Sequence, residues 1–452
     1  MQAQVTLDSS NRRLVEGFQW AKAQALAYVF EGDPVGDWYE AALPGREAFC
    51  MRDVAHQSMG AQVLGLSRHT HNMLHKFAAN IADARDWCSF WEIDRYDRPC
   101  PVDYRDDRDF WYNLPANFDV LHCCYRQYLW TGDRRYLDDP VFRTFYAATV
   151  NDYVRRWDRD GDGIPEHYAP YGRRGIASYN EAVERPLVGA DLIAAQYAAY
   201  LAYADLLASM GGDAAADGWR AKADQLRVLY ESQWWFEEKQ RFASVRRHNQ
   251  QLDTHFRAIA SFLPLYFGLV KDSRKVDAAL SDVIAHRREL GIEDRSYLPE
   301  LFYAYGRPAL AYAELAEQLA PNYPRREYPE VSYAVIGSIA AGMMGIAPDA
   351  TTRTVATLAQ LDEQTAWVEL DGVPVFGNVL CVRHEGNTQS VLTHQAGRPL
   401  RWQARFAGHQ PHPAVDGRPA VAHHGWTAYG QPVTWVTVDV ESGSRHVANS
   451  QR

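Results

Sequence analysis

Cysteine frameworks, long apolar runs and a positive net charge are all missing from this chain of 452 residues. Its six cysteines form no CxxC pair and show no metal-ligand spacing, so they predict neither a disulfide scaffold nor a cysteine metal site. No apolar run is long enough to cross a membrane, and none at the N-terminus resembles a signal peptide. The cellular location therefore stays open: cytoplasmic, or periplasmic after removal of a signal.

The charge balance argues against one class of partner. The net charge is −10 and the pI is about 5.9, whereas phosphate binding needs a basic surface, so nucleic acid is not expected as a partner. Hydrophobic residues make up 47% of the chain, which allows a sizeable core and argues against wholesale disorder. Aromatic residues reach 13%, with 14 tryptophans, and this richness favours a carbohydrate or another planar ligand.

Residues 45–117 combine fixed charges with aromatic rings more densely than the rest of the chain. Such a mixture suits a cleft for a polyhydroxylated, ring-shaped ligand, because rings stack on aromatic faces while charged groups bind hydroxyls. The alternative is a buried charge network beneath loops. The predicted substrate-binding residues, including two from later segments, are Arg52, Asp53, His56, Gln57, Trp91, Trp111, Tyr112, Asn113, Tyr179 and Arg295.

Three histidines lie in the segment that follows this charged stretch's first helix. His71 and His75 are four residues apart, a spacing that can ligate zinc on one helix face, and His69 lies nearby. The HExxH arrangement is missing, so solvent-facing or capping histidines are the preferred interpretation.

Alternating carboxylates and glycines between positions 158 and 166 form an oxygen-rich loop. The spacing matches the start of an EF-hand loop, although no flanking helix pair and no Glu at position 12 is evident. A structural calcium site is one interpretation, and a carboxylate-rich turn satisfied by backbone amides is the other. The predicted ligands are Asp158, Asp160, Asp162, Ile164 and Glu166. No organic cofactor is expected.

Helical periodicity repeats in successive pairs of segments up to about Ile346 and then stops. Eleven or twelve helices are expected, with residues 1–10 loose and residues 293–300 forming a loop. From Trp367 to Val440 the pattern alternates as in strands, with turns at Asp-Gly and Glu-Gly pairs. The prediction is a mainly α fold, a toroid of helical hairpins over residues 11–350, followed by a small β-sandwich over 360–442. Periodicity alone does not separate a closed toroid from an open solenoid.

Three motifs carry a resemblance to a known group. Met51-Arg52-Asp53 opens the second helix, Asp158 to Glu166 forms the acidic loop, and Glu327 to Glu330 precedes the last long helix. With these motifs the chain resembles the six-hairpin glycosidases, carbohydrate-active enzymes built on an (α/α)6 barrel. The β-rich end is similar to the small sandwich that follows the barrel in rhamnosidase-like members.

This resemblance implies cleavage of glycosidic bonds in plant-type oligosaccharides or polysaccharides. Several families on this barrel are inverting hydrolases, and transfer by position makes Glu181 or Glu184 the acid and Glu327 or Glu330 the base. Direct attack by water needs two carboxyl groups roughly 6.5–9.5 Å apart. The acid must stay protonated near neutral pH, which requires a dry or anionic setting.

Two other functions remain open on the same architecture. Some polysaccharide lyases are (α/α)6 toroids, and rhamnosyl–glucuronate cleavage by β-elimination needs a base together with a group that neutralises the uronate. Arg52, His56, Tyr112, Tyr179 and Arg295 could supply these groups. A non-catalytic carbohydrate-binding protein is the third possibility, because a fold does not settle chemistry. Hydrolysis is the preferred expectation, and an unsaturated, ultraviolet-absorbing product would identify a lyase.

Overall fold

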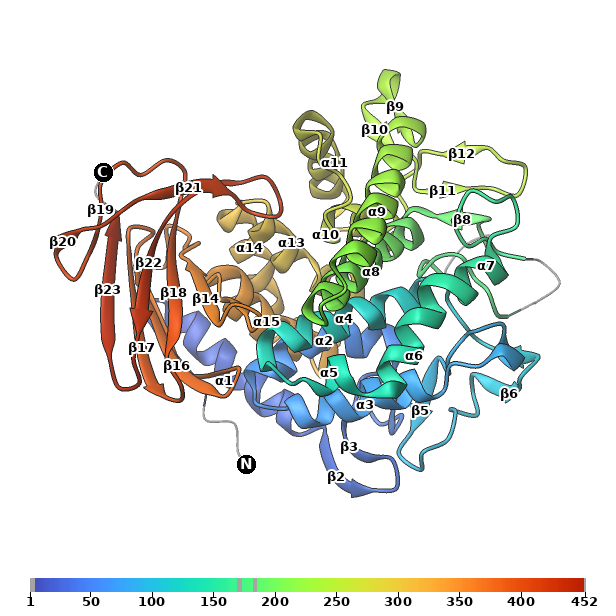
Figure 1. The fold of residues 1–452 in the computed structure, drawn as a ribbon, viewed down its shortest axis with the longest axis horizontal. Helices are drawn as coiled ribbons and strands as arrows, with labels where there is room; N and C mark the ends of the chain where they lie inside the picture. Colours follow the sequence, from blue (N-terminus) through green and yellow to red (C-terminus); the bar gives the residue numbers. More distant parts are fainter. Residues whose placement is uncertain (1–4, 169–172, 182–184, 451–452) are drawn as a thin grey trace.

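Two regions of different secondary structure follow one another along the chain in this computed structural model, which describes residues 5–168, 173–181 and 185–450. Helices dominate up to Met343, and strands dominate from Ala347 onward. Figure 1 shows the strands of the second region, in orange and red, standing beside the helical region. The predicted change from helical periodicity to alternation is therefore present in the structure.

The helical region contains long helices in successive pairs, with shorter helices between them. Their bounds are α1 Arg12–Leu26, α2 Met51–Val63, α3 Ser67–Ala79, α4 Pro115–Thr131, α5 Arg135–Asp138, α6 Pro140–Ala148, α7 Val154–Trp157, α8 Ala190–Ser209, α9 Asp213–Gln233, α10 Ile259–Tyr266, α11 Ser273–His286, α12 Ile292–Ser296, α13 Leu298–Ala304, α14 Pro308–Gln318 and α15 Pro329–Gly337. Two π-helical segments, η2 Thr149–Tyr153 and η5 Ser338–Met343, continue α6 and α15.

Local sequence explains where several helices begin and end. Pro115 opens α4, where the missing N–H costs nothing, and Gly132 ends it in the left-handed conformation that glycine adopts without strain. The Asp139 side chain accepts a hydrogen bond from the Val141 N–H and so caps α6. The α8 helix is apolar on most faces and lies buried among its neighbours, as its sequence predicts.

One set of helices, with one member from each pair, packs side by side in a continuous series. Helix α2 packs on α4, α4 on α8, α8 on α10 and α10 on α13; α13 packs on η5, and α15, which η5 continues, packs on α2. The other members of the pairs do not belong to this series. For example, α9 packs on α8, and α11 packs on α10. Helices α2 and α15 approach so closely that a Cβ on Gly60 would lie 2.1 Å from the Tyr333 carbonyl oxygen.

Residues 293–300 do not form the predicted loop. Helix α12 ends at Ser296, and α13 starts at Leu298 with Pro299 in its first turn. A proline there is compatible with a helix, because first-turn N–H groups have no intrahelical partner. Buried Leu301 and Phe302 supply the apolar face of α13, but its seven residues are too few to show a clear helical period in the sequence.

Short strands line the long connections of the helical region. A two-stranded hairpin, β2 and β3, precedes α2, and β4 pairs with β5. Residues 240–253 contribute strands β10, β11 and β12 to two small sheets. The bounds are β2 Val29–Asp33, β3 Gly36–Tyr39, β4 Ala48–Cys50, β5 Glu92–Asp94, β6 Tyr104–Asp106, β7 Asp109–Phe110, β8 Val188–Gly189, β9 Trp235–Phe236, β10 Arg241–Phe242, β11 Val245–Arg246 and β12 Leu252–Asp253.

Two larger sheets form the second region, in the orders β1-β15-β16-β17-β23-β19-β20 and β13-β14-β18-β22-β21. Neighbours are antiparallel except for β14 and β18. The two sheets contact each other where β22 meets β19 and β23. The bounds are β13 Ala347–Asp349, β14 Thr354–Leu358, β15 Trp367–Val375, β16 Asn378–Glu385, β17 Gln389–Ala396, β18 Leu400–Ala407, β19 Pro413–Val415, β20 Arg418–Pro419, β21 His423–Trp426, β22 Pro432–Val440 and β23 Arg445–Ser450.

The N-terminal segment was predicted to be loose, and this is wrong for its second half. Strand β1, Thr6–Ser9, pairs antiparallel with β15 and so joins the seven-stranded sheet. Its partner lies some 360 residues away in the sequence, a pairing that no local pattern can indicate. In the described part of the chain, no helix combines the length and apolar character needed to cross a membrane.

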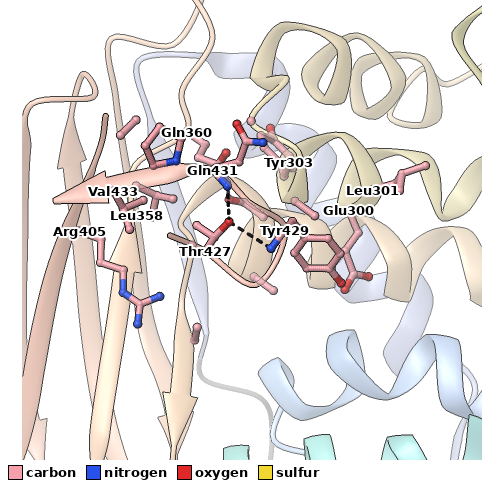
Figure 2. A pocket seen from close by; sticks show the side chains of 18 of the residues that line it. Glu300, Leu301, Tyr303, Leu358, Gln360, Arg405, Thr427, Tyr429, Gln431 and Val433 are labelled. Carbon is pink, nitrogen blue, oxygen red and sulfur yellow. Dashed lines mark hydrogen bonds between the residues drawn. The ribbon is translucent and has the colours of Figure 1, made fainter. Parts of the chain in front are cut away.

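A cavity of ≈ 390 Å³ lies where α13 faces strands β14, β18 and β22 (Figure 2). Tyr429, from the β21–β22 connection, donates a hydrogen bond to the Tyr266 carbonyl oxygen at 2.8 Å and links the two regions. Glu300 is the one carboxylate among the described residues that line this cavity. A single carboxylate cannot supply the pair that glycoside hydrolysis requires, so this cavity is not the candidate active site.

Candidate active site

A second cavity, of ≈ 550 Å³, lies where helices α2, α10 and α12 begin. Arg52 belongs to the first turn of α2, Glu293 to the first turn of α12, and Ile259 opens α10. The cavity thus gathers helix N-termini, whose partial positive charge favours carboxylates. Its lining residues are Ala42, Leu43, Arg46, Cys50, Arg52, Asp53, Trp91, Glu92, Asp103, Trp111, Tyr179, Asn180, Glu181, Ala258, Ile259, Glu293, Asp294 and Tyr328.

Six of the residues predicted from the sequence for binding or catalysis line this cavity. Those in the lining are Arg52, Asp53, Trp91, Trp111, Tyr179 and Glu181. His56, Gln57, Tyr112, Asn113, Arg295, Glu327 and Glu330 are not among the described residues that form the wall. Glu184 falls outside the described residues.

Arg52 is the central charge of the site. Its Nη2 donates to Glu293 Oε2 at 2.9 Å, and its Nε donates to Asp53 Oδ1 at 3.2 Å. Its guanidinium also lies 5.8 Å from the centre of the Tyr179 ring. Arg52 therefore connects helix α2, helix α12 and the segment before α8.

Glu330 is buried close enough to feel the charges of this ion pair, and it is not among the described residues of the cavity wall. It occupies the first turn of α15, its side chain is buried, and Oε2 has no hydrogen-bond partner among the described residues. Burial raises its pKa well above the usual range, and the negative charges of Asp53 and Glu293 add to this while Arg52 opposes it. Glu327 is exposed. The role of either as catalytic base stays a prediction.

Glu181 reaches the cavity from the segment that precedes α8. Its Oε1 accepts a hydrogen bond from Asn113 Nδ2 at 2.9 Å, which explains how Asn113 supports the site without lining it. Desolvation by the cavity walls raises the pKa of Glu181, although part of the side chain stays exposed, and Arg52 opposes this shift. A carboxyl group with a raised pKa is suited to act as a general acid.

Two buried carboxylates hold the Glu181 segment in place. Asp191, in the first turn of α8, accepts hydrogen bonds from the Tyr179 N–H at 2.5 Å and from the Ser178 hydroxyl at 3.1 Å. The Tyr179 hydroxyl donates to Asp119 Oδ2 at 3.1 Å. Burial raises the pKa of Asp191 to about 6 and that of Asp119 to about 7. Tyr179 and Asp191 therefore fix the position of the segment that carries Glu181.

Two cavity carboxylates were missed at the sequence level, Glu293 and Asp294. Burial raises the pKa of Asp294 to about 6, with Arg52 opposing the shift. The available signal was the pair of adjacent acids at 293 and 294, two residues after Gly291, a pattern typical of a first helical turn. It was overlooked because this segment was predicted to be a loop.

Arg46, Glu92 and Asp103 also line the cavity, and the sequence did not predict them as site residues. Arg46 pairs with Glu92 at 2.7 Å and with Asp103 at 3.0 Å. Burial raises the pKa of Glu92, and the neighbouring Asp103 adds to this while Arg46 opposes it. These residues fall in the charged stretch that the sequence singled out, and they give the cavity a second arginine–carboxylate pair.

Two other predicted binding residues, His56 and Tyr112, form supporting contacts, and a third, Gln57, is buried with no hydrogen bond from its side chain among the described residues. His56 Nε2 is 2.8 Å from the Ser296 hydroxyl, and its ring stacks on Tyr297 at 3.5 Å. Burial lowers the pKa of His56 to about 3, so the imidazole is neutral near pH 7. Buried Tyr112 donates to Asn117, and buried Gln57 lies in the middle of α2.

Arg295 contacts a different part of the protein. It donates to Glu314 and Glu317, at 2.6 Å each, on helix α14. These two ion pairs tie α12 to α14. Its neighbours on α12, Glu293 and Asp294, are the residues that line the cavity.

The acidic loop between α7 and β8 brings the carboxylates of Asp158, Asp160 and Asp162 within 4.8 Å of one another. The same carboxylates also accept backbone N–H groups of the loop, as in the 2.8 Å bond from Gly161 to Asp158. Arg246 is 3.2 Å from Asp162 and 3.8 Å from Glu166. An all-oxygen donor set suits calcium, and the amide bonds and Arg246 suit a self-sufficient turn, so both interpretations remain.

Comparison with known proteins adds evidence of family and fold. Residues 125–297 match the family model described as the mannosylglycerate hydrolase MGH1-like glycoside hydrolase domain. No curated protein matches the chain.

Solved structures share the fold at low sequence identity. A GH78 family rhamnosidase of Bacillus sp. GL1 has a TM-score of 0.62 at 13% identity, over 87% of this chain and 41% of that chain. The α-L-rhamnosidase from Dictyoglumus thermophilum has a TM-score of 0.62 at 12% identity, over 100% and 51%. The α-L-rhamnosidase from Aspergillus terreus has a TM-score of 0.61 at 14% identity, over 99% and 50%.

The chain spans about half or less of the length of these solved structures. Residues 125–297 are thus similar to a glycoside hydrolase domain, and the chain shares its fold with the rhamnosidases. This agrees with the resemblance drawn from the sequence motifs.

Proposed function

We propose that this protein is a glycoside hydrolase that cleaves a glycosidic bond of an oligosaccharide in the cavity at the start of α2 and α12. One observation carries the proposal: Glu181 and the Glu293–Asp294 pair line a single cavity together with the rings of Trp91 and Trp111. Hydrolysis of a glycoside needs two carboxyl groups, and a sugar ring needs an apolar face to stack on.

The architecture in this proposal is an (α/α)6 barrel. Six inner helical positions, α2, α4, α8, α10, α13 and α15 with η5, would close into a ring, supported by the packing of α15 on α2. We assign the catalytic domain to residues 11–350 and the accessory β-sandwich to 360–442. Strands β1, β13, β14 and β23, outside the second range, extend the two sheets.

The carboxylates divide into candidate acids and a candidate base. Burial raises the pKa of Glu181, and it raises that of Asp294 to about 6, so either can hold the proton that the departing sugar oxygen needs. Glu293 is held in an ion pair with Arg52, which suits the base that activates water. In this scheme Glu330 is a positioning residue, because it is buried, interacts electrostatically with Arg52 and is not part of the lining.

The substrate in this proposal is an oligosaccharide or small glycoside. A cavity of ≈ 550 Å³ is within the usual size range for small-ligand pockets. The matching family model is named after a mannosylglycerate hydrolase, and the structures with a similar fold are rhamnosidases. Mannosylglycerate, α-rhamnosides and plant-gum oligosaccharides containing uronate are therefore the substrates to try first.

The decisive experiment measures release of free sugar from this panel and, in parallel, ultraviolet absorbance. Glu293→Gln, which removes the base, and whichever of Glu181→Gln and Asp294→Asn removes the acid should each reduce kcat by roughly a hundredfold or more, which is typical for loss of an acid or base. Glu289→Gln is the matched control, because Glu289 is exposed just before α12 and should leave the rate unchanged. An absorbance rise in step with product release would instead establish β-elimination, and binding without turnover of any substrate would contradict the enzyme assignment.

A further inference from the structure

The first turn of α3 carries a histidine that is buried without hydrogen bonds. The His69 side chain is only 7% exposed, and neither ring nitrogen has a hydrogen-bond partner among the described residues. A buried imidazole without partners is costly, because its polar nitrogens lose their contacts with water. Such a group calls for a partner that the polypeptide itself does not provide.

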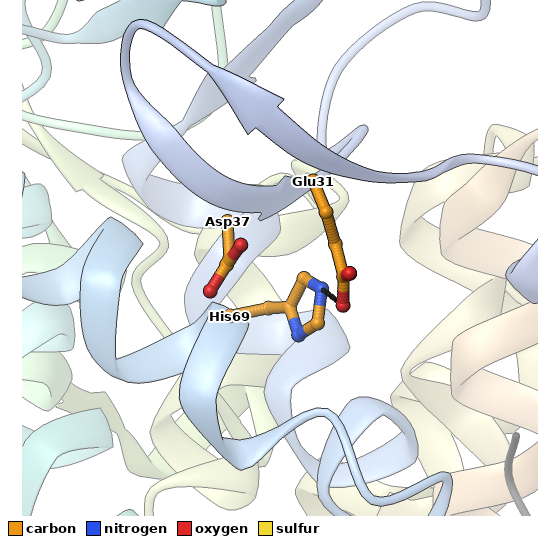
Figure 3. Close-up of side chains that lie close together, drawn as sticks. All are labelled: Glu31, Asp37 and His69. Carbon is orange, nitrogen blue, oxygen red and sulfur yellow. Dashed lines mark ion pairs between the residues drawn. The ribbon is translucent and has the colours of Figure 1, made fainter. Parts of the chain in front are cut away.

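Two carboxylates face this ring from the hairpin that packs on α3. Glu31 lies on β2 and Asp37 on β3, and Figure 3 shows the His69 ring between them. One oxygen from each carboxylate and one ring nitrogen all lie within 4.8 Å of one another. His69 Nε2 is 3.5 Å from Glu31 Oε1. Two ligands of a tetrahedral zinc ion with bonds of about 2.1 Å are separated by roughly 3.4 Å.

We propose that Glu31, Asp37 and His69 form a binding site for a divalent transition metal, with zinc as the best fit. One imidazole nitrogen and two carboxylate oxygens are ligands that zinc uses in proteins, and water would complete the coordination. The nitrogen ligand separates this site from the acidic loop at 158–166, whose donors are all oxygens and suit calcium.

The state of the histidine is compatible with this role. Burial lowers the pKa of His69, so the ring is neutral near pH 7 and one nitrogen carries a free lone pair. The negative charges of Asp37 and Glu31 oppose that shift, and they would compensate the charge of a bound cation.

Arg68 acts in this proposal as a competitor for the carboxylates. Its Nη2 lies 3.0 Å from Glu31 Oε1, and its Nε lies 2.8 Å from Asp37 Oδ2. The Arg68 side chain is 65% exposed, so it can turn into solvent when a metal ion takes over both oxygens. Removal of Arg68 should therefore strengthen metal binding, whereas removal of a ligand should weaken it.

The site would tie the β2–β3 hairpin to α3. Strand β3 ends at Tyr39, and Ala42 and Leu43, which follow shortly after, line the candidate active-site cavity. A metal ion would thus stabilise the fold and hold one part of the cavity wall in place. The proposal does not depend on which reaction the cavity performs.

The test uses the full chain, treated with chelator and titrated with Co²⁺ and Zn²⁺. Bound Co²⁺ gives visible absorption bands that report nitrogen and oxygen ligands, calorimetry gives the stoichiometry, and thermal unfolding with Zn²⁺ gives the stabilisation. One ion per chain is expected, with a rise in Tm that persists in excess Ca²⁺. His69→Ala should abolish binding, Glu31→Gln and Asp37→Asn should each weaken it at least tenfold, and Arg68→Ala should strengthen it.

His71→Ala is the matched control. His71 lies two residues further along α3, and its ring packs edge-on against Tyr136 and Phe142 rather than against the two carboxylates. This variant should bind Co²⁺ as the unmodified chain does. Equal binding in His69→Ala, or a loss in His71→Ala that would point to the His71–His75 pair, would overturn the proposal. Failure of the unmodified chain to bind either ion would overturn it as well.

Discussion

Arg52 and Glu293, 241 positions apart in the sequence, form a 2.9 Å ion pair that joins the start of α2 to the start of α12. Both residues line the larger cavity, and the Arg52 side chain is only 15% exposed. The charges of Arg52 and Glu293 also act on buried Glu330, where Glu293 adds to the rise in pKa and Arg52 opposes it. This contact brings together two segments that the sequence presents as unrelated.

Replacement of Arg52 should therefore reduce both stability and activity. Arg52→Ala leaves Asp53 and Glu293 without their cation; the Asp53 side chain is only 9% exposed, and loss of one partner of a buried ion pair typically costs about 3–5 kcal/mol. Urea unfolding measures this loss. Arg12→Ala is the control, because the Arg12–Glu16 pair is 90% and 61% exposed and should contribute less than about 1 kcal/mol. Equal effects of the two substitutions would mean that Arg52 is not a central charge.

Substitution of the two tryptophans that line the cavity should have different effects: one should weaken sugar binding, and the other should lower stability. Trp111 is partly buried, so Trp111→Ala should leave stability nearly unchanged and weaken sugar binding by about 1 kcal/mol, roughly fivefold in Kd. Trp91 is 8% exposed and packs against Tyr112 and Tyr179, so Trp91→Ala should cost about 3–5 kcal/mol of folding free energy. Calorimetric titration and urea unfolding distinguish the two. A large stability loss with unchanged affinity in Trp111→Ala would assign Trp111 to the core.

Asp119 should make stability depend on pH. Burial raises its pKa from 3.8 to about 7, so between these values the native chain holds a proton that the unfolded chain has lost. The free energy of unfolding should therefore fall as pH rises from about 4 to about 7 and then level off. Asp119→Asn should flatten this part of the unfolding profile. Asp217→Asn, at a 78% exposed side chain, should leave the profile unchanged; an unaltered slope in Asp119→Asn would show that Asp119 is not its source.

The close approach of α2 and α15 should make Gly60 irreplaceable. A Cβ there would lie 2.1 Å from the Tyr333 carbonyl oxygen, and backbone cannot give way as a flexible side chain can. Gly60→Ala should cost at least about 1–3 kcal/mol, as overpacking does. Gly218, in the middle of α9, has open space where a Cβ would lie, so Gly218→Ala should stabilise by about 0.5–1 kcal/mol. Thermal unfolding of both variants tests the helix contact, and a neutral Gly60→Ala would contradict it.

Calcium at the acidic loop is a separate prediction. If Asp158, Asp160 and Asp162 bind the ion, removal of calcium with a selective chelator should lower Tm, and added Ca²⁺ should restore it. Asp160→Asn should weaken this response, whereas His69→Ala should retain it. If the chelator does not change Tm, the calcium prediction is wrong, and the loop is a turn stabilised by backbone amides and Arg246.

The sequence by itself determined the features that depend on near neighbours. Helical periodicity to Ile346 and alternation from Trp367 reflect which faces of each element are apolar, a property visible in short windows. The density of charges and rings in residues 45–117 likewise pointed to Arg52, Asp53, Trp91 and Trp111, which do line the cavity. These positions lie at the start of α2 or in the long connection between α3 and α4, so local composition was sufficient.

Tertiary structure alone decided which distant groups meet. An acid in the first turn of a helix looks the same whether it lines a cavity, as Glu293 does, or is buried outside the lining, as Glu330 is, because the helix dipole favours both. Likewise, β1 joins a sheet made from the other end of the chain, and His69 rather than the regularly spaced His71 and His75 faces two carboxylates. Such outcomes depend on how helices and strands pack across hundreds of residues, and no short-range pattern encodes that packing.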